Sequence, residues 1–306
     1  MKLPPSPVRA PVRAAVRAAV RAALRPALKA GVSPTLQRRW LDASALALPM
    51  PAGVRAGRGV LSGVPGRVLV PERSEPHTAV VYLHGGGYVT GSSFAYRTLA
   101  ARIAECCGSR VFVPDYRRAP EHPYPAAVDD AVAFVRGVQA TGVRRLVLAG
   151  DSAGAGIALA AAGRLRDIGV DVPELLGLLS PWVDLTFTGD SLRTRAGRDP
   201  LLRETWLREC AVGYRRFESA EHPELSPLRT DPAHLPPLLI QAGTDDILFS
   251  DAERLARRAD EAGTLRSYRR FPGLWHDFQL FAGLLPDADE AVAAFGGEVH
   301  AALHTA

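Results

Sequence analysis

Ser152 is the residue in this sequence best placed to act as a nucleophile. It lies between two glycines in the segment Gly150-Asp151-Ser152-Ala153-Gly154, which follows an apolar run from Leu146 and precedes an alanine-rich stretch. A strand, a tight turn and a helix in this order form a nucleophile elbow, in which the serine hydroxyl projects from a strained turn. An ordinary glycine turn before a helix could have the same residues, so the interpretation depends on partners elsewhere in the chain.

A glycine loop supplies the first of these partners. The segment His84-Gly85-Gly86-Gly87 directly follows the apolar run Ala79–Leu83. Acyl transfer places negative charge on a carbonyl oxygen, and backbone N–H groups aimed at that oxygen stabilise it. We expect the N–H groups of Gly86, Gly87 and Ala153 to form this oxyanion hole. A phosphate-binding loop is the alternative, but the residues after the glycines lack the Lys-Ser/Thr or the third spaced glycine that it needs.

His276 is the expected general base. It lies in a loop just past the last expected strand, Leu265–Phe271. In proteins with a nucleophile elbow the three catalytic residues follow the order serine, acid, histidine along the chain, so the base comes last. The other histidines after Ser152 are expected to be surface residues, namely His222, His234, His300 and His304.

The acid should follow the apolar strand Leu238–Gln241, where two adjacent carboxylates are present. Alternation alone cannot choose between Asp245 and Asp246, and Asp246 is preferred because its two-residue step to Leu248 matches an Asp-x-Leu pattern that belongs to the family resemblance given below. Asp245 is then expected to be a solvated turn residue. In the alternative interpretation, both carboxylates only cap the following helix.

The elements that must position these residues alternate between strands and helices from Val54 onward. Such alternation predicts one α/β domain with a mostly parallel sheet flanked by helices. The region from about Asp184 to Pro227 breaks the alternation and is expected to be an insertion that covers the site. A further helix is expected over Ser33–Leu48, with Ser33 as its cap, and another over Ser250–Ala262, capped by Ser250. The other expected elements are strands at 54–61, 67–70, 79–83, 111–113, 146–149 and 175–179, and helices at 96–107, 126–135, 153–166 and 288–302.

The first thirty residues differ in composition from the rest. Residues 8–30 repeat a four-residue unit that begins Val-Arg-Ala and ends in Pro or Ala, with variants toward the end. The first thirty residues contain seven Lys or Arg and no acid. We expect residues 1–30 to be a basic Ala/Arg/Pro-rich tail, frayed or disordered, with residues 31–306 forming a single domain. A surface or partner-binding helix and a packed cap helix are the alternatives. Because four residues overshoot one helical turn, the arginines are expected to wind around the axis.

Composition excludes several classes of protein. The chain has 306 residues, of which 47% are hydrophobic, which is enough for one large buried core. The net charge of +5 resides in the first thirty residues, since removing their seven bases from 37 leaves 30 bases against 32 acids. We therefore expect no nucleic-acid partner. Three cysteines without metal-site spacing suggest no disulfide framework and no metal, and the basic N-terminus lacks the apolar run of a signal peptide. A cytoplasmic protein without a transmembrane segment is expected.

Four motifs of this sequence resemble those of the hormone-sensitive lipase family, also called bacterial family IV esterases. The first two are the glycine loop and the Ser152 elbow described above. The others are Asp115-Tyr116-Arg117-Arg118-Ala119-Pro120-Glu121 and Trp275-His276-Asp277-Phe278. The resemblance covers roughly Ser33 to the C-terminus. It implies an α/β-hydrolase fold with a helical cap from about residues 31–50 and 184–227, a triad of Ser152, Asp246 and His276, and no cofactor.

Two positions depart from the family pattern. Ala155 stands where a third glycine is usual, and Asp246-Ile247-Leu248 stands where Asp-Pro-Leu is usual. We expect the segment beginning at Asp115, and also His84, to hold the glycine loop in place rather than to contact substrate.

The expected function is that of a serine carboxylesterase acting on a small-molecule ester, with short acyl chains as a family-level expectation. A deacetylase or amidase, or a lactone hydrolase, would use the same triad. A non-catalytic receptor is the alternative from a different class. A homodimer through the sheet edge near the last strand is a further expectation.

Overall fold

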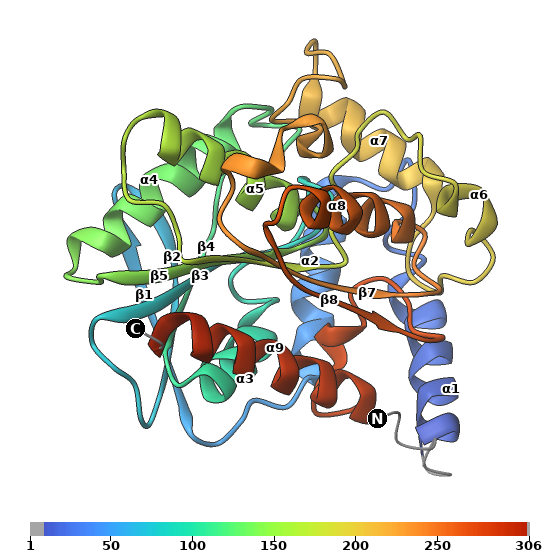
Figure 1. Cartoon of the computed structure of the whole chain (residues 1–306). Helices are drawn as coiled ribbons and strands as arrows, with labels where there is room; N and C mark the ends of the chain where they lie inside the picture. The colour runs from blue at the N-terminus through green and yellow to red at the C-terminus, as the bar shows by residue number, and fades with distance from the viewer. Residues whose placement is uncertain (1–8, 305–306) are drawn as a thin grey trace.

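Eight strands form one sheet in the order β1-β2-β4-β3-β5-β6-β7-β8 in the computed structural model, which describes residues 9–304 (Figure 1). The pairs β1–β2 and β2–β4 are antiparallel, and the remaining pairs are parallel. The strands are β1 (Val54–Leu61), β2 (Val64–Pro71), β3 (Thr78–Leu83), β4 (Arg110–Pro114), β5 (Arg145–Asp151), β6 (Leu175–Leu179), β7 (Leu238–Gly243) and β8 (Leu265–Phe271). Every expected strand is present, with ends that differ by at most three residues.

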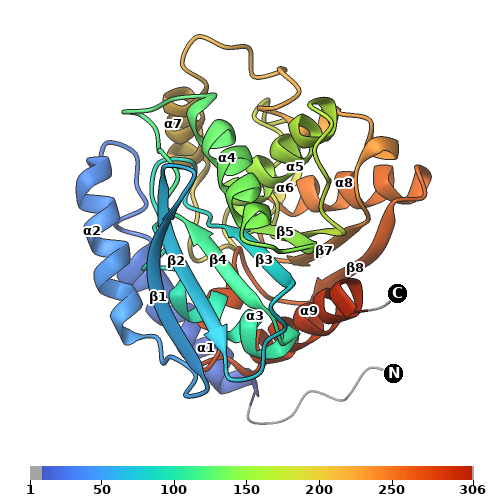
Figure 2. The same cartoon turned by 90° about the vertical axis from the view of Figure 1, so that its left-hand side faces the viewer.

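Helices cover both faces of this sheet (Figure 2). Helices α3 (Arg97–Cys107) and α9 (Pro286–His304) pack together on one face. Helices α4 (Ala126–Ala140), α5 (Ser152–Asp167) and α8 (Phe249–Glu261) lie on the other. Because both faces are covered, strands β3, β6 and β7 are buried along their whole length, which explains why they appeared in the sequence as continuous apolar runs.

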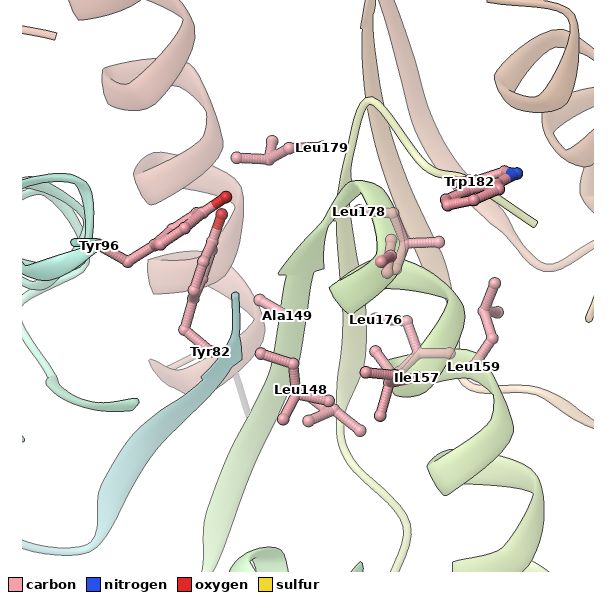
Figure 3. Close-up of a cluster of buried hydrophobic side chains, with 14 of the residues drawn as sticks. Tyr82, Tyr96, Leu148, Ala149, Ile157, Leu159, Leu176, Leu178, Leu179 and Trp182 are labelled. Carbon is pink, nitrogen blue, oxygen red and sulfur yellow. The ribbon is translucent and has the colours of Figure 1, made fainter. Parts of the chain in front are cut away.

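The core beside β5 is built from its neighbours on both sides. Figure 3 shows Leu148 and Ala149 of β5 among side chains of β6 and α5, including Leu176 and Ile157. Most of these side chains are fully buried. The strand that ends at the Ser152 elbow is therefore held in a close-packed environment, which fixes the position of the turn.

The N-terminal segment differs from the expected disordered tail. From Arg9 onward the chain forms helix α1 (Arg9–Ala19), which continues as a π-helical stretch (Val20–Leu24). Val20 and Leu28 are buried. The favoured interpretation failed because Val12, Val16 and Val20 pack against the core of the protein, and tertiary packing, not local propensity, supplies most helix stability. Residues 1–8 of the expected tail lie outside the described residues.

The arginines of α1 also differ from expectation. Arg9, Arg13 and Arg17 contact one continuous strip of the body instead of winding around the helix axis. Each four-residue step rotates the side-chain direction by only about 40°, and the long arginine side chains can absorb the drift over the two steps from Arg9 to Arg17.

The expected helix at Ser33–Leu48 is present as α2 (Pro34–Ser44) followed by a short 3-10 helix (Ala45–Ala47). Ser33 caps it by accepting a hydrogen bond from the Leu36 N–H. The insertion contains α6 (Ser191–Thr194) and α7 (Glu204–Arg215). A hydrogen bond of 3.0 Å from Trp206 Nε1 to Gln37 Oε1 joins α7 to α2, so the N-terminal helices and the insertion meet.

Two further details concern the C-terminal half. The expected cap of α8 is wrong: the helix begins at Phe249, and the Ser250 hydroxyl accepts a hydrogen bond from the Ser191 N–H of the insertion. Strand β8 forms one edge of the sheet. The dimer expected at that edge stays a prediction.

Short 3-10 helices complete the described elements. They lie at Pro227–Arg229, Pro232–His234 and Phe278–Phe281.

Candidate active site

Ser152 lies at the turn between β5 and α5, with a φ of 50°. A non-glycine residue with positive φ is strained, as a nucleophile elbow requires. The backbone of Gly154 approaches the neighbouring strand β3 so closely that a Cβ atom there would lie 2.0 Å from the Leu83 carbonyl oxygen. The turn therefore needs glycine at this position, and the sequence pattern has the structural context that it predicted.

His276 and Asp246 come together from the loops after β8 and β7. The Nδ1 atom of His276 lies 3.0 Å from each carboxylate oxygen of Asp246, and both side chains are buried. The Leu248 N–H donates a further hydrogen bond of 2.7 Å to Asp246 Oδ1. Asp245 faces away and forms an ion pair of 2.6 Å with Arg17. Of the two adjacent carboxylates, the structure thus places Asp246 against His276.

The other ring nitrogen of His276 is the one available for chemistry. Among residues 9–304 it forms no hydrogen bond, although Oδ2 of Asp277 lies 3.1 Å away. His276 and Ser152 line the same cavity. Burial by itself lowers the pKa of His276, but the nearby carboxylates of Asp246 and Asp277 outweigh burial and raise that pKa well above its usual value.

Asp151 and Asp277 form a buried carboxyl pair that the sequence analysis did not identify. Asp151 accepts hydrogen bonds of 2.9 Å from the hydroxyls of Tyr82 and Tyr96 and from the Gly85 N–H. Figure 3 shows the two tyrosine rings beside each other. Burial and then the charge of Asp277 raise the pKa of Asp151 well above its usual value. The two carboxyl groups are therefore close enough to interact electrostatically, and burial raises the pKa of Asp277 as well.

The glycine loop lies on the same cavity as the Ser152 side chain. Gly86 has a φ of 115°, which strongly favours glycine, and Gly86 and Gly87 both line the cavity. Among the described residues no acceptor takes the N–H of Gly86 or Gly87. Ala153, the second residue of α5, is in the first turn of a helix, where N–H groups lack partners within the helix.

The loop is held from beneath, as the sequence analysis expected for His84 and the segment that begins at Asp115. Tyr116 donates a hydrogen bond of 2.7 Å to the His84 carbonyl oxygen, and its ring stacks on the imidazole at 4.3 Å between centroids. The carboxylate of Asp115 accepts hydrogen bonds from the N–H and the hydroxyl of Ser93. Burial lowers the pKa of His84 to about 4, so this histidine is neutral at physiological pH.

An apolar cavity of about 350 Å³ lies above these groups. Its walls come from α1, the π-helical stretch, α2, the insertion and the loop after His276. The apolar lining side chains are Val16, Ala19, Val20, Ala23, Leu24, Leu28, Leu41, Ala45, Ala47, Leu48, Ala95, Leu201, Leu202, Trp206, Leu280, Phe281 and Leu284. In the described part of the chain, no three His, Cys, Asp or Glu side chains gather in a way that could hold a metal ion.

Comparison with known proteins places this geometry in a family. Residues 80–280 match the family described as alpha/beta hydrolase fold. The chain belongs to this family. A solved structure of an esterase from the bacterial hormone-sensitive lipase family matches this α/β hydrolase with a TM-score of 0.89 and 34% identity, over 98% of this chain and 100% of that one. The resemblance seen in the sequence motifs is thereby confirmed.

Relatives of known sequence support the same family assignment. An acetyl-hydrolase of Streptomyces hygroscopicus is 40% identical over 228 residues, covering 74% of this α/β hydrolase and 76% of that protein. An esterase of Acinetobacter venetianus is 31% identical over 268 residues, covering 86% and 87%. These relatives place the chain among the ester hydrolases of the hormone-sensitive lipase family. No helix within residues 9–304 is both long and apolar enough to cross a bilayer.

Proposed function

We propose that this protein is a serine carboxylesterase that hydrolyses small, short-acyl esters through an acyl-enzyme intermediate. Ser152 would be the nucleophile, His276 the general base and Asp246 the acid that orients it. The observation that carries the proposal is the shared cavity. It is bordered by Ser152 at its strained turn, by His276, and by Gly86 and Gly87, whose N–H groups find no acceptor among the described residues.

The mechanism follows from these positions. His276 removes the Ser152 proton at Nε2 as the hydroxyl oxygen attacks the ester carbonyl, and the imidazolium formed is stabilised by Asp246 at Nδ1. The N–H groups of Gly86, Gly87 and Ala153 stabilise the oxyanion. His276 then gives its proton to the alcohol, which leaves. Water attacks the acyl-enzyme with His276 again as base and releases the carboxylic acid.

The cavity supports a small apolar substrate. Its volume of about 350 Å³ lies near the lower end of the range for ligand pockets, roughly 300–1,000 Å³. Its walls are almost entirely aliphatic or aromatic, which suits the hydrocarbon part of an ester, and the Asp277 carboxylate among them would disfavour an anionic substrate. The acetyl-hydrolase relative agrees with a short acyl group.

The test is a series of p-nitrophenyl esters from acetate to laurate, assayed on the wild type and on Ser152→Ala. We expect the highest kcat/KM on the short esters. We expect Ser152→Ala to lower turnover by roughly 10³-fold or more, because the members of a triad act as a unit. Acetanilides and simple lactones assayed in parallel distinguish an ester hydrolase from an amidase or a lactonase. Near-normal ester turnover by Ser152→Ala would contradict the assignment of the nucleophile.

A further inference from the structure

The arginine row of α1 connects the N-terminal helix to the body of the protein. Arg9 pairs with Glu290 at 2.7 Å, and Arg13 pairs with Asp287 at 2.7 Å, so these two arginines bind the first turns of α9. Arg17, one helical turn further along, does not contact α9. Its guanidinium reaches the loops that carry Asp246 and His276.

Arg17 makes contacts with the immediate neighbours of both residues. Its Nη2 atom donates to Asp245 Oδ2 at 2.6 Å and to the Gly273 carbonyl oxygen at 2.8 Å. Asp245 directly precedes Asp246, and Gly273 lies three residues before His276. The guanidinium carbon also lies 5.2 Å from the ring centre of Trp275, the buried residue that directly precedes His276. One planar side chain thus spans the acid loop and the base loop.

The insertion also contacts the loop that carries Asp246. Arg17 Nη1 donates to the Arg198 carbonyl oxygen at 2.5 Å. The next residue, Asp199, is fully buried, and its Oδ2 accepts a hydrogen bond of 3.1 Å from the Ile247 N–H. Ile247 directly follows Asp246, so the acid is bracketed by a contact to Arg17 before it and a contact to Asp199 after it.

We propose that Arg17 is a positioning residue of the active site, which fixes the Asp246 loop and the His276 loop relative to each other from helix α1. This inference rests on the proposed function. A guanidinium suits the task because its rigid fork serves several acceptors at once, which an ammonium cannot do in one geometry. Because α1 also lines the cavity with Val16 and Ala19, the helix that holds the two loops contacts the space where substrate would bind.

The first test is Arg17→Gln, with Arg9→Gln as the matched control on the same helix. Both variants remove one ion pair between α1 and the body, but only Arg17→Gln releases the two loops. We expect Arg17→Gln to lower kcat on p-nitrophenyl acetate by roughly 10- to 100-fold, with KM within about twofold of the wild type, because misplacement of catalytic groups by about 1 Å has effects of this size. We expect Arg9→Gln to retain wild-type kcat, and Arg17→Lys to recover only part of the loss.

The second test removes the partner instead of the helix residue. We expect Asp245→Asn to lower kcat, and the double variant with Arg17→Gln to be no worse than the more impaired single variant, because both changes break the ion pair between Arg17 and Asp245. If Arg17→Gln fails to fold, Asp245→Asn alone is the test, and a kcat within about twofold of the wild type would overturn the inference. Multiplicative losses in the double variant would show that Arg17 does not act through Asp245 and would overturn the inference.

Three other results would overturn it: a kcat for Arg17→Gln within about twofold of the wild type, an equal loss in Arg9→Gln, or a change confined to KM. The rate at which a fluorophosphonate probe labels Ser152 is measured alongside, since it reports the alignment of the base without an ester substrate. If the wild type hydrolyses no ester, the proposed function fails, while slower labelling of Arg17→Gln than of Arg9→Gln would still support the positioning role.

Discussion

At the scale of single residues, the site depends on which of two adjacent carboxylates faces the histidine. Asp246 lies within 3.0 Å of His276 Nδ1 with both its oxygens, and Asp245 pairs with Arg17. An acid that accepts the Nδ1 proton keeps Nε2 free to receive the proton of Ser152. The two positions should therefore respond very differently to the same chemical change.

We expect Asp246→Asn to lower kcat for p-nitrophenyl acetate by about 10³- to 10⁴-fold, because an amide can donate to Nδ1 and stabilise the wrong tautomer of His276. Asp245→Asn is the matched control, one residue away, and its smaller loss should stay within about 100-fold. The measurement is the ratio of the two kcat values. Comparable losses in both variants would argue against Asp246 as the acid.

Asp277 should set the pH dependence of the reaction. Only neutral His276 can accept a proton, so kcat/KM falls as the pH drops through the pKa of the free enzyme's histidine. The Asp277 carboxylate stabilises the protonated form and raises that pKa. Asp277→Asn removes this charge, so the pKa of His276 should fall and the acid limb of the kcat/KM profile should move to lower pH.

The measurement is a kcat/KM profile from pH 4 to 9 for the wild type and for Asp277→Asn. Glu290→Gln is the control, since it removes a carboxylate that pairs with Arg9 far from His276. An acid limb that stays in place, or moves to higher pH, would contradict the role given to Asp277.

Much of the site could be predicted at this scale, because Ser152, His276 and the glycine loop occupy short motifs whose strand and loop context is local. Asp277 and Asp151 could not be assigned a role from the sequence. Their interaction arises where the loop after β8 meets the elbow after β5, and spacing along the chain does not report such a contact. The sequence signal that could have drawn attention to them was their position inside two motifs, Asp151 in the Ser152 elbow and Asp277 directly after His276.

At the scale of elements, the elbow depends on a close approach between β3 and α5. The backbone of Gly154 leaves no room for a methyl group, since the Leu83 carbonyl oxygen would lie 2.0 Å from it. Gly163 is on the same helix, and a methyl group there would meet no atom within 4 Å. The two glycines therefore have opposite consequences for stability.

We expect Gly154→Ala to destabilise the protein by about 3 kcal/mol or more, because backbone atoms cannot move aside as a flexible side chain can. Gly163→Ala should stabilise it by about 0.5–1 kcal/mol, since alanine is the better helix former. Urea denaturation followed by circular dichroism measures both. A Gly154→Ala protein as stable as the wild type would mean that strand and helix are less closely fixed than the structure indicates.

The sequence predicted the elements of the sheet and its covering helices well, because their apolar periodicity is a local property of β3, β5 and β7. It did not predict α1. The Val-Arg-Ala repeat has a helical composition, but its stability comes from contacts of Arg13 and Arg17 with residues more than 200 positions later. Local patterns cannot distinguish a packed helix from a frayed one when the partners lie so far along the chain.

At the scale of the whole molecule, the cavity is assembled from parts that are far apart in the sequence. Helices α1 and α2 at one end of the chain, the insertion at 184–227 and the loop after His276 each supply a wall. If this cavity binds the substrate, as we propose, these segments and not the triad would limit the size of the substrate. A change to a cavity-lining residue of α1 that leaves both the triad and Arg17 untouched should alter selectivity alone.

We expect Ala19→Phe to lower kcat/KM for p-nitrophenyl octanoate relative to acetate by roughly 10-fold, because the larger ring would fill part of the apolar space that a longer chain needs. Ala18→Phe is the matched control: Ala18 is the adjacent residue on α1, is exposed, and does not line the cavity. The same ester series measured on both variants gives the ratio. An equal ratio in the two variants would indicate that acyl chains bind elsewhere, whereas a fall confined to Ala19→Phe would place the acyl chain against helix α1.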